Sequence, residues 1–336
     1  MKTRAPTVLD VARVAGVSTA TVSRVLNNTA EARPETRQAV LAAVDSLGYR
    51  PNPLARDLRR WRSQRVLALF PELNSPVMTD LYRGVVDVAR ENGYVVLLAP
   101  TLGDPDRELE LIQLARSRSV DALICLGTSL SAEELNDLGR TEAIIQVLEC
   151  YDAPNTARIS IDDVAAARDL TGHLLSLGHR DIAFLGNRLA LPGRLREEGV
   201  RQALAGAGVP LLPDLVSDGD YGFQHGRDAT RRLLGLPQPP TAVACVSDVV
   251  AAGVVAEARA MGMRVPQDVA VAGFDDSREA TMSVPPITTV RQPFEEIGRI
   301  SFRTLLHNLN NSTAPDHSHR MVPHELVLRE STIGPA

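Results

Sequence analysis

The first part of the chain carries three short helical patterns of apolar and polar positions. They lie at about 7–15, 18–27 and 34–47. Thr7 with Asp10 has the spacing of a capping box, Ser18 is a favourable N-cap, and Pro34 suits a first helical turn. Only "GVS" (16–18) joins the first two helices. This spacing, with its glycine, predicts a helix-turn-helix unit.

The second of these helices has two unlike sides. Val22, Val25 and Leu26 form its apolar side. The other side holds small, hydroxyl, arginine and asparagine residues: Thr19, Ala20, Thr21, Ser23, Arg24 and Asn27. Hydroxyl groups and helix N-terminal N–H groups can bind phosphates, arginine can bind guanine, and small side chains can meet thymine methyl groups. The polar side therefore predicts a DNA-contacting surface, with an ordinary solvent-facing helix as the alternative.

Beyond residue 64 the pattern changes from helices to alternating strands and helices. The connecting segment "YRPNPLARDLRRWRSQ" (49–64) has two prolines, five arginines and little apolar periodicity, which is typical of a linker. Apolar strands begin at Val66, and the strand–helix rhythm restarts after "ISIDD" (159–163). Two βαβ series predict an α/β core of two doubly wound parallel sheets, with ligand at the carboxyl ends of strands and between the lobes. The tail segments 287–292, 293–309 and 324–330 can pass back through both lobes.

The net charge of −5 is unevenly distributed. Residues 1–62 hold 11 Lys and Arg against 5 Asp and Glu, a net charge of +6, and the rest of the chain carries −11. This asymmetry indicates that only the first part meets a polyanion.

Other sequence features narrow the class of protein. The three cysteines stand in or beside apolar runs without CxxC spacing, which predicts buried reduced thiols and no metal site. We expect a cytoplasmic protein with no membrane contact, because no apolar run approaches about 18 residues and no signal-peptide pattern is present. No GxGxxG, P-loop, GxSxG or HExxH motif occurs, so neither an enzyme nor a bound cofactor is expected. A pure binding protein is a weaker alternative, since the basic first part argues against it.

Two long segments carry a family resemblance. "TVLDVARVAGVSTATVSRVLNN" (7–28) and "TRQAVLAAVDSLGYRPNPLARDL" (36–58) closely resemble the DNA-binding head of the lac-repressor/galactose-repressor family of bacterial transcription factors. "SLGHRDIAFLG", "GFDD", "PPITTVRQPFEEIG" and "HELVLRES" resemble the regulatory core of that family. The resemblance therefore extends over the whole chain, and it implies a repressor whose affinity for a palindromic DNA operator is controlled by a small-molecule effector.

The resemblance also implies roles in DNA binding for individual residues. Thr19, Ala20 and Arg24 would face base edges in the major groove. Phosphates would be contacted by Ser18, Thr21, Ser23 and Asn27. In the hinge helix "NPLARDL" (52–58), Leu58 next to Ala55 would enter the minor groove and kink the duplex. For Leu58, packing on the core is the alternative.

The same resemblance implies an effector site between two lobes. It assigns to effector binding these residues: Asn74, Ser75, Arg196, Tyr221, Ser247, Asp248, Asp275 and Phe294. An arginine and an aspartate can hold the vicinal hydroxyls of a sugar or polyol, and an aromatic side chain can cover a ring face. As alternatives, Asp275 could cap a turn, Arg196 could pair with Glu197 or Glu198 on the surface, and Phe294 could be plain core.

Departures from the family pattern concern the effector contacts. Many sugar-binding members have Asn where this chain has Ser247. They also have an Asp near the end of the fourth strand, where this chain offers Glu149 or Asp152 without a clear register. A standard hexose contact set is therefore not expected.

The resemblance also sets the expected domains and assembly. It divides the chain into a helix-turn-helix head (1–50), a hinge and linker (51–63), an N-terminal lobe (64–163 and 293–320) and a C-terminal lobe (164–292 and 321–331). No leucine heptads follow Glu330, so a homodimer is expected rather than a tetramer.

Overall fold

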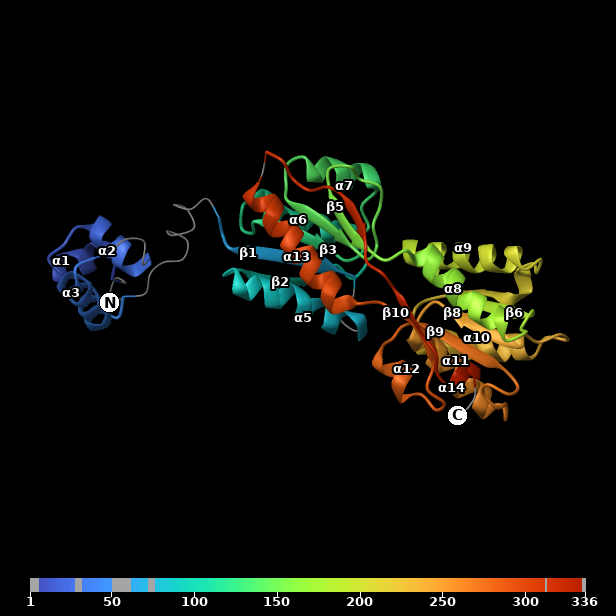
Figure 1. The fold of residues 1–336 in the computed structure, drawn as a ribbon. Coiled ribbons are helices and arrows are strands. Elements are labelled where there is room, and N and C mark those ends of the chain that lie inside the picture. The colour runs from blue at the N-terminus through green and yellow to red at the C-terminus, as the bar shows by residue number, and fades with distance from the viewer. Residues whose placement is uncertain (1–5, 28–31, 50–61, 72–75, 312, 334–336) are drawn as a thin grey trace. The chain divides into compact units, whose positions relative to one another are not determined.

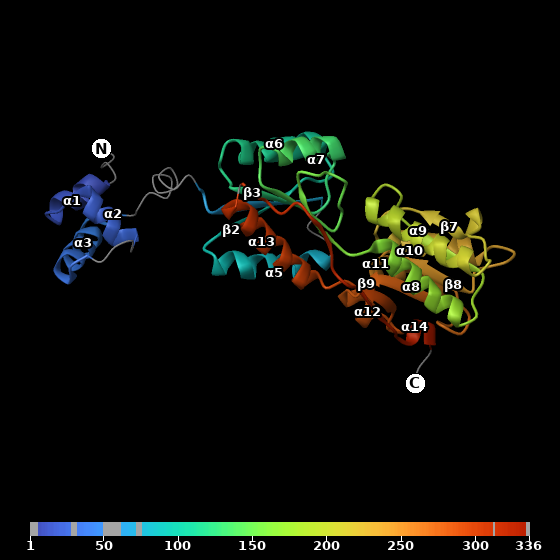
Figure 2. The same cartoon turned by 45° about the horizontal axis from the view of Figure 1, so that its top comes forward.

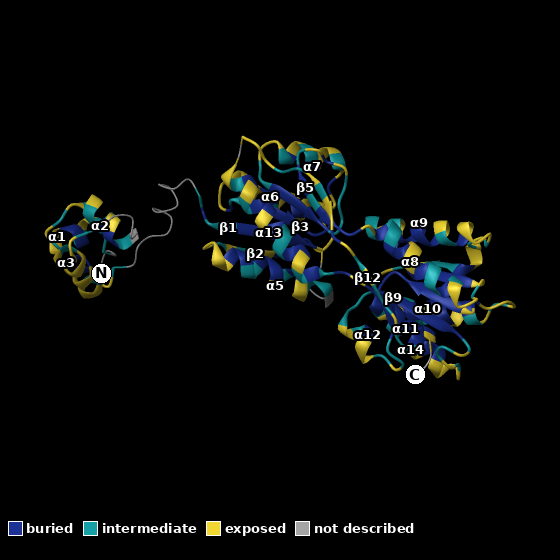
Figure 3. Cartoon of the chain, viewed as in Figure 1, coloured by how far each residue is buried: buried dark blue, intermediate teal, exposed yellow. Residues whose placement is uncertain are grey.

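The computed structural model of the chain describes residues 6–27, 32–49, 62–71, 76–311 and 313–333. The chain divides into two compact units, residues 1–63 and 64–336. Each unit has its own buried core, as Figure 3 shows.

The first unit is built from three helices, α1 (Val8–Val14), α2 (Thr19–Asn27) and α3 (Pro34–Leu47) (Figure 1). Its small core contains Val11, Val22, Val25 and Val40, because the apolar stripes of the three helices face one another. The backbone N–H and hydroxyl of Thr7 both donate to Asp10 Oδ2, at 2.9 and 2.7 Å. The predicted capping box of Thr7 with Asp10 and the three predicted helices are confirmed.

Tight turns end α1 and α3. The backbone φ of Gly16 is 66° and that of Gly48 is 59°, a left-handed conformation that glycine adopts at low cost. The N–H of the next residue then reaches back to a carbonyl of the last helical turn, from Val17 to Ala12 at 3.0 Å and from Tyr49 to Val44 at 3.0 Å. The turn at Gly16 brings α2 back against α1.

The first sheet of the second unit has the strand order β11-β5-β4-β3-β1-β2. Within the described residues, every pairing between neighbouring strands of this sheet is parallel. Its strands are β1 (Arg65–Phe70), β2 (Val95–Pro100), β3 (Ala122–Cys125), β4 (Ile144–Val147), β5 (Ala157–Ser160) and β11 (His319–Met321). The helices around it are α5 (Pro76–Glu91), α6 (Pro105–Arg116), α7 (Ala132–Gly139) and α13 (Phe294–Asn310). Alternate residues of β1 enter two different cores, since Phe70 packs on the side of α5 and α13 and Leu69 on the side of α6 and α7.

The second sheet has the order β12-β10-β9-β8-β6-β7, with β12 antiparallel to β10. Its strands are β6 (Ile182–Gly186), β7 (Val216–Asp218), β8 (Ala242–Cys245), β9 (Ala270–Asp275), β10 (Thr288–Arg291) and β12 (Glu325–Val327). The helices of this part are α8 (Asp163–Ser176), α9 (Leu191–Gly206), η1 (Pro213–Leu215), α10 (Phe223–Leu234), α11 (Asp248–Ala260), α12 (Arg278–Met282) and α14 (Glu330–Ile333). The pairs α8–α9 and α10–α11 cover the faces of this sheet (Figure 2).

The chain passes between the two sheets three times. It crosses from β5 to α8, returns from β10 to α13, and crosses again from β11 to β12. The predicted fold class, a three-helix head followed by a core of two doubly wound sheets, is confirmed. No helix in the described ranges is both long and apolar enough to cross a membrane.

Two glycines allow α5 and α13 to cross closely. A Cβ atom on Gly298 would lie 2.2 Å from the carbonyl oxygen of Leu81, and one on Gly84 would lie 1.9 Å from that of Glu295. A larger residue at either position must therefore push the helices apart. This crossing fixes α13, which comes from the last part of the chain, to the first sheet.

Candidate functional site

The polar side of α2 is available at the surface of the first unit. Val22 and Val25 are 0% and 4% exposed and anchor the helix in the core. On the other side, Ala20 and Arg24 are exposed, and the half-buried residues are Thr19, Thr21 and Ser23. No acidic residue occurs in α2. The predicted division of this helix into an apolar and a polar side is confirmed, and the polar side can approach a polyanion.

The hydroxyl of Ser18 organises the start of α2. Its Oγ accepts the backbone N–H of Thr21 at 3.1 Å and lies 2.9 Å from Thr21 Oγ1. Ser18 thus has the predicted N-capping role, which satisfies one of the free N–H groups of the first turn. Asn27 is the last residue of α2, and its side chain lies outside the described part of the structure.

Four predicted site residues fall outside the described ranges. They are Ala55 and Leu58 of the hinge, and Asn74 and Ser75 after the first strand. Their assigned contacts stay predictions.

In the second unit, Arg196 of α9 is the centre of a buried polar cluster at the carboxyl ends of β8 and β9. The side chain of Arg196 is 7% exposed. Its Nε donates to Asp163 Oδ1 at 2.8 Å, and its Nη1 donates to the Val246 carbonyl at 2.6 Å. The guanidinium group also lies 3.7 Å from the ring centroid of Phe274. The alternative of a surface pair with Glu197 or Glu198 was wrong, because α9 turns Arg196 toward the sheet and Glu197 toward other arginines.

Asp275 and Tyr221 belong to the same cluster. Asp275 ends β9, with its Oδ1 3.7 Å from Arg196 Nη1 and 2.8 Å from the donor Gln292 Nε2. Burial raises the pKa of Asp275 to about 7, although Arg196 acts in the opposite direction. Burial also raises the pKa of Tyr221 to about 12, with Arg196 lowering it and Asp275 raising it. The structure therefore brings Arg196, Asp275 and Tyr221 into one electrostatic group, and their assignment to effector binding stays a prediction.

Three other predicted effector residues are engaged within the protein. Ser247 caps α11, and its Oγ accepts the N–H of Val250 at 3.3 Å. Asp248 is 0% exposed; its Oδ1 accepts the hydroxyl of Thr289 at 2.6 Å, and its Oδ2 accepts the N–H of Ser277 at 2.7 Å. Phe294 is buried in the core. These contacts account for the positions of the three side chains without a bound ligand. Their assignment to effector binding stays a prediction.

Glu149 has a role that the sequence left open. Its Oε1 accepts the backbone N–H of Leu191 at 3.0 Å and the hydroxyl of Tyr151 at 3.0 Å. Leu191 is the first residue of α9, so the carboxylate of Glu149 lies at the positive end of that helix. Asp152 instead pairs with Arg158 at 2.8 Å and is largely exposed. Of the two acids that follow β4, Glu149 is therefore the one that reaches the helix carrying Arg196.

The buried polar cluster around Arg196 contains one cation, two carboxylates and one phenol: Arg196, Asp163, Asp275 and Tyr221. Among the residues that the structure describes, no group of three or more His, Cys, Asp or Glu side chains is arranged to hold a metal ion. The fold and the exposed polar helix together define a DNA-binding protein with a two-lobed ligand-binding core.

Comparisons with known proteins agree with this description. Residues 7–52 match the family described as bacterial regulatory proteins, lacI family, and residues 171–332 match the periplasmic binding protein-like domain. Catabolite control protein A of Priestia megaterium is 33% identical over 329 residues, which cover 97% of this chain and 99% of that protein.

Solved structures extend the similarity to the whole fold. A transcriptional regulator CelR–cellobiose complex is 32% identical with a TM-score of 0.73, covering 97% of this chain and 99% of that one. The lac repressor dimer bound to operator and the anti-inducer ONPF is 26% identical with a TM-score of 0.88, covering 98% and 99%. The chain belongs to the lacI family of bacterial regulatory proteins, and it is a DNA-binding transcriptional regulator.

Proposed function

We propose that this protein is a homodimeric, cytoplasmic repressor that binds a palindromic operator through α2 and releases it in response to a small polyol, without catalysing a reaction. The observation that carries the proposal is the exposed polar side of α2, held outward by the buried Val22 and Val25. A dimer presents two such helices, and the two-fold symmetry of the protein requires a palindromic DNA site.

The residues of α2 divide into base-reading and phosphate-binding groups. Arg24 can bind guanine through two hydrogen bonds, whereas Thr19 and Ala20 are small and can contact thymine methyl groups. The hydroxyls of Ser18, Thr21 and Ser23, with Asn27, bind phosphates and fix the orientation of the helix. Because Thr19 and Ala20 offer few polar atoms, Arg24 carries most of the polar base recognition. In residues 51–63, Ala55 and Leu58 enter the minor groove at the operator centre.

The effector site is the cluster around Arg196. Among the described residues, Nη2 of Arg196 and Oδ2 of Asp275 have no protein partner, so one donor and one acceptor remain for a ligand. This combination suits vicinal hydroxyl groups. Arg196 is the cation of the cluster and already faces the carboxylates of Asp163 and Asp275. A phosphorylated ligand would place further negative charge beside the carboxylates of Asp163 and Asp275, which would repel it. The effector is therefore an uncharged polyol or sugar.

Dimerisation is supported by the edge strand β2. Val95, Leu97 and Leu98 are 57%, 38% and 39% exposed, which leaves apolar side chains on the open edge of the first sheet. An exposed apolar edge strand favours association with another chain. A second copy of the protein would cover it.

Selection of bound sequences from a random duplex pool tests the DNA-binding part of this function. The full-length protein at about physiological salt should enrich a palindrome, and Arg24→Ala should not enrich it. Raising the salt concentration should weaken binding steeply, because phosphate contacts release counterions. A folded dimer that enriches no sequence, with or without a metabolite mixture, would contradict the proposal.

The effector is tested on the operator that the selection provides. Neutral sugars and polyols are compared with their phosphates in an operator-release assay. Release by neutral compounds is expected, whereas release by phosphates alone would show that the Arg196 cluster does not select the ligand. Tyr221→Phe, which removes one hydroxyl, is a mild variant that should weaken the response while leaving DNA binding unchanged.

A further inference from the structure

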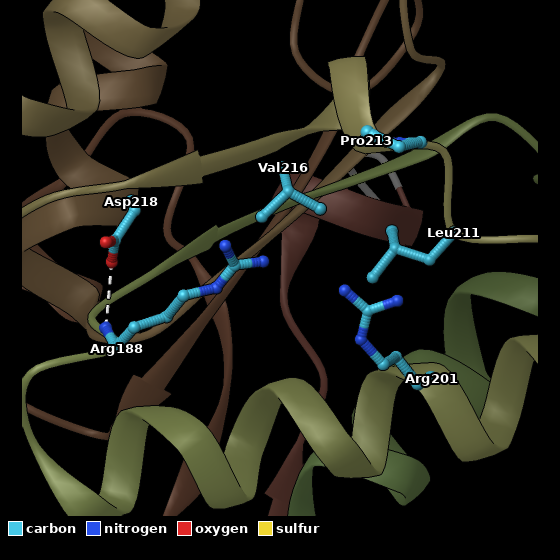
Figure 4. Close-up of a pocket in the computed structure, with 6 residues that line it drawn as sticks. All are labelled: Arg188, Arg201, Leu211, Pro213, Val216 and Asp218. Carbon is cyan, nitrogen blue, oxygen red and sulfur yellow. Dashed lines mark hydrogen bonds between the residues drawn. The ribbon is translucent and has the colours of Figure 1, made fainter.

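A cavity of about 280 Å³ lies in the second unit beside α9, the loop after β6 and strand β7 (Figure 4). It is lined by three apolar side chains, two arginines and one aspartate: Leu211, Pro213, Val216, Arg188, Arg201 and Asp218. Small-molecule sites in proteins commonly begin at about 300 Å³. At about 280 Å³, this cavity lies near the lower end of that range, so it is suited to a small ligand.

The two arginines of this cavity are held by one buried acid, Glu197. Arg188 donates through Nε to Glu197 Oε2 at 2.7 Å and through Nη2 to Oε1 at 2.8 Å. Arg201 donates through Nε and Nη2 to the same Oε1, at 3.1 and 2.6 Å. The side chain of Glu197 is only 10% exposed, and the hydrogen bonds from Arg188 lower its pKa below the usual value despite burial. Glu197 therefore stays ionised and fixes both guanidinium groups.

This arrangement leaves donors and positive charge facing the cavity. Each guanidinium group uses Nε and Nη2 on Glu197, and neither Nη1 has a partner among the residues that the structure describes. Figure 4 shows both guanidinium groups directed into the space between the labelled side chains. Two cations share one carboxylate, so the group of three carries one excess positive charge. The carboxylate of Asp218 does not bind either guanidinium and instead accepts the backbone N–H of Arg188 at 2.8 Å.

We propose that this cavity binds a small organic monocarboxylate. The carboxylate would accept hydrogen bonds from the Nη1 groups of Arg188 and Arg201, which are strong because both partners are charged. The apolar body of the acid would lie against Leu211 and Val216. Asp218 repels any anion in this cavity, and it repels a dianion such as phosphate more strongly than a monocarboxylate, whose single charge the excess positive charge of the two arginines and Glu197 can offset.

The site is separate from the Arg196 cluster, although both involve α9. Arg196 and Glu197 are consecutive in the helix and point about 100° apart. Arg196 binds Asp163 and Val246 on one side, and Glu197 binds the cavity arginines on the other. A carboxylate in the cavity therefore contacts none of the residues assigned to the polyol.

Calorimetric titration of the full-length protein with benzoate tests this site, with benzamide as the uncharged compound of the same shape. Benzoate should bind with saturation at one site per chain. The affinity for benzamide should be lower by a factor of about ten or more, because benzamide cannot form the charge-assisted pair with the arginines. Equal binding of the two compounds would overturn the proposal, as would no binding of benzoate at millimolar concentration.

Three variants separate this cavity from general attraction to surface arginines. Arg201→Gln removes the excess charge and should weaken benzoate binding about tenfold. Asp218→Asn keeps an acceptor for the Arg188 N–H but removes the repelling charge, and it should strengthen binding. The matched control is Arg231→Gln, because Arg227 and Arg231 also converge on one buried acid, Glu257, without lining this cavity. Arg231→Gln should bind benzoate like the wild type, and equal losses in Arg201→Gln and Arg231→Gln would refute the site.

A fourth variant covers the case in which Arg201→Gln does not fold. Leu211→Trp fills the cavity from its apolar side and leaves both arginines and Glu197 in place. It should abolish benzoate binding. Unchanged binding by a folded Leu211→Trp protein would show that benzoate binds elsewhere.

Discussion

Replacement of Asp275 by Asn should make the protein more stable at neutral and alkaline pH. Asp275 is largely buried; it lies 3.7 Å from Arg196 Nη1 and accepts a hydrogen bond from the neutral Gln292. Asp163 binds Arg196 at 2.8 Å, whereas Asp275 lies 3.7 Å from it. The attraction between Arg196 and Asp275 is therefore the weaker of the two. Asp and Asn are both enriched among non-glycine residues with positive φ, so the φ of 113° at this position does not oppose the exchange. The substitution therefore removes a poorly compensated charge with little change in shape.

The sign and size of the effect follow from the pKa of Asp275. Burial raises this pKa from 3.8 to about 7 in the folded protein. Between these two pH values the folded state binds more protons than the unfolded state, so the free energy of unfolding of the wild type falls as pH rises. The full difference corresponds to about 4 kcal/mol. Asn does not titrate, so the variant should gain up to about this amount relative to the wild type as pH rises from 4 to 7, and remain ahead above pH 7.

Urea unfolding followed by far-ultraviolet circular dichroism, from about pH 3 to about pH 8.5, measures this difference and covers the pKa values of both folded and unfolded Asp275. The neighbouring Asp276 is the control, since hydrogen bonds from Arg329 (2.5 Å) and Arg291 (2.6 Å) outweigh its burial and lower its pKa. Asp276→Asn should destabilise the protein at pH 7, and its deficit should shrink as pH falls below about 4. A pH-independent difference for Asp275→Asn would refute the reasoning. A wild-type advantage that grows with pH would show that attraction to Arg196 outweighs burial.

Three further substitutions test other parts of the structure. Arg24→Ala should weaken specific operator binding by about 1–3 kcal/mol in gel-shift titrations with little change in stability, because Arg24 is exposed and we propose that it contacts a base; equal losses on random DNA would instead indicate a phosphate contact. Arg196→Ala should lower the free energy of unfolding by about 3–5 kcal/mol, because it leaves Asp163 buried without its cation; a second change, Asp163→Asn, should restore part of this, and no restoration would mean that the pair is not the cause. Gly298→Ala should cost about 1–3 kcal/mol in urea unfolding through overpacking against Leu81, and a neutral result would mean that α5 and α13 can separate freely.

Local patterns in the sequence were sufficient for the head and for the fold class. The positions of Val22 and Val25 set the buried side of α2, and Thr7 with Asp10 set the start of α1. These are contacts between residues three or four apart, so periodicity and capping chemistry determine them. The alternation of strands and helices likewise predicts parallel sheets, because a right-handed crossover allows few other arrangements. The short elements β7, β11, α12 and α14 gave no such pattern, since three to five residues are too few for a period.

Family resemblance named residues of the Arg196 cluster, but it could not say which of their atoms are already engaged within the protein. Ser247 and Asp248 match effector positions by resemblance, yet their oxygens bind Val250, Thr289 and Ser277 within the protein. Such contacts depend on how the turns after β8 and β9 pack together, which local pattern does not reveal.

The sequence by itself determined a basic helix-turn-helix head and a core of two doubly wound sheets, whereas the grouping of Arg196 with Asp275 was implied only by the family resemblance. Only the tertiary structure decided that Asp163 is the main partner of Arg196, that Glu149 rather than Asp152 reaches α9, and that Glu197 holds Arg188 and Arg201 at a second cavity. The physical reason is the distance along the chain over which each kind of interaction acts. Periodicity and capping act over a few residues, whereas burial and ion pairing depend on segments such as Asp163 and Arg196, which are 33 positions apart and meet only when the sheet and its helices have packed.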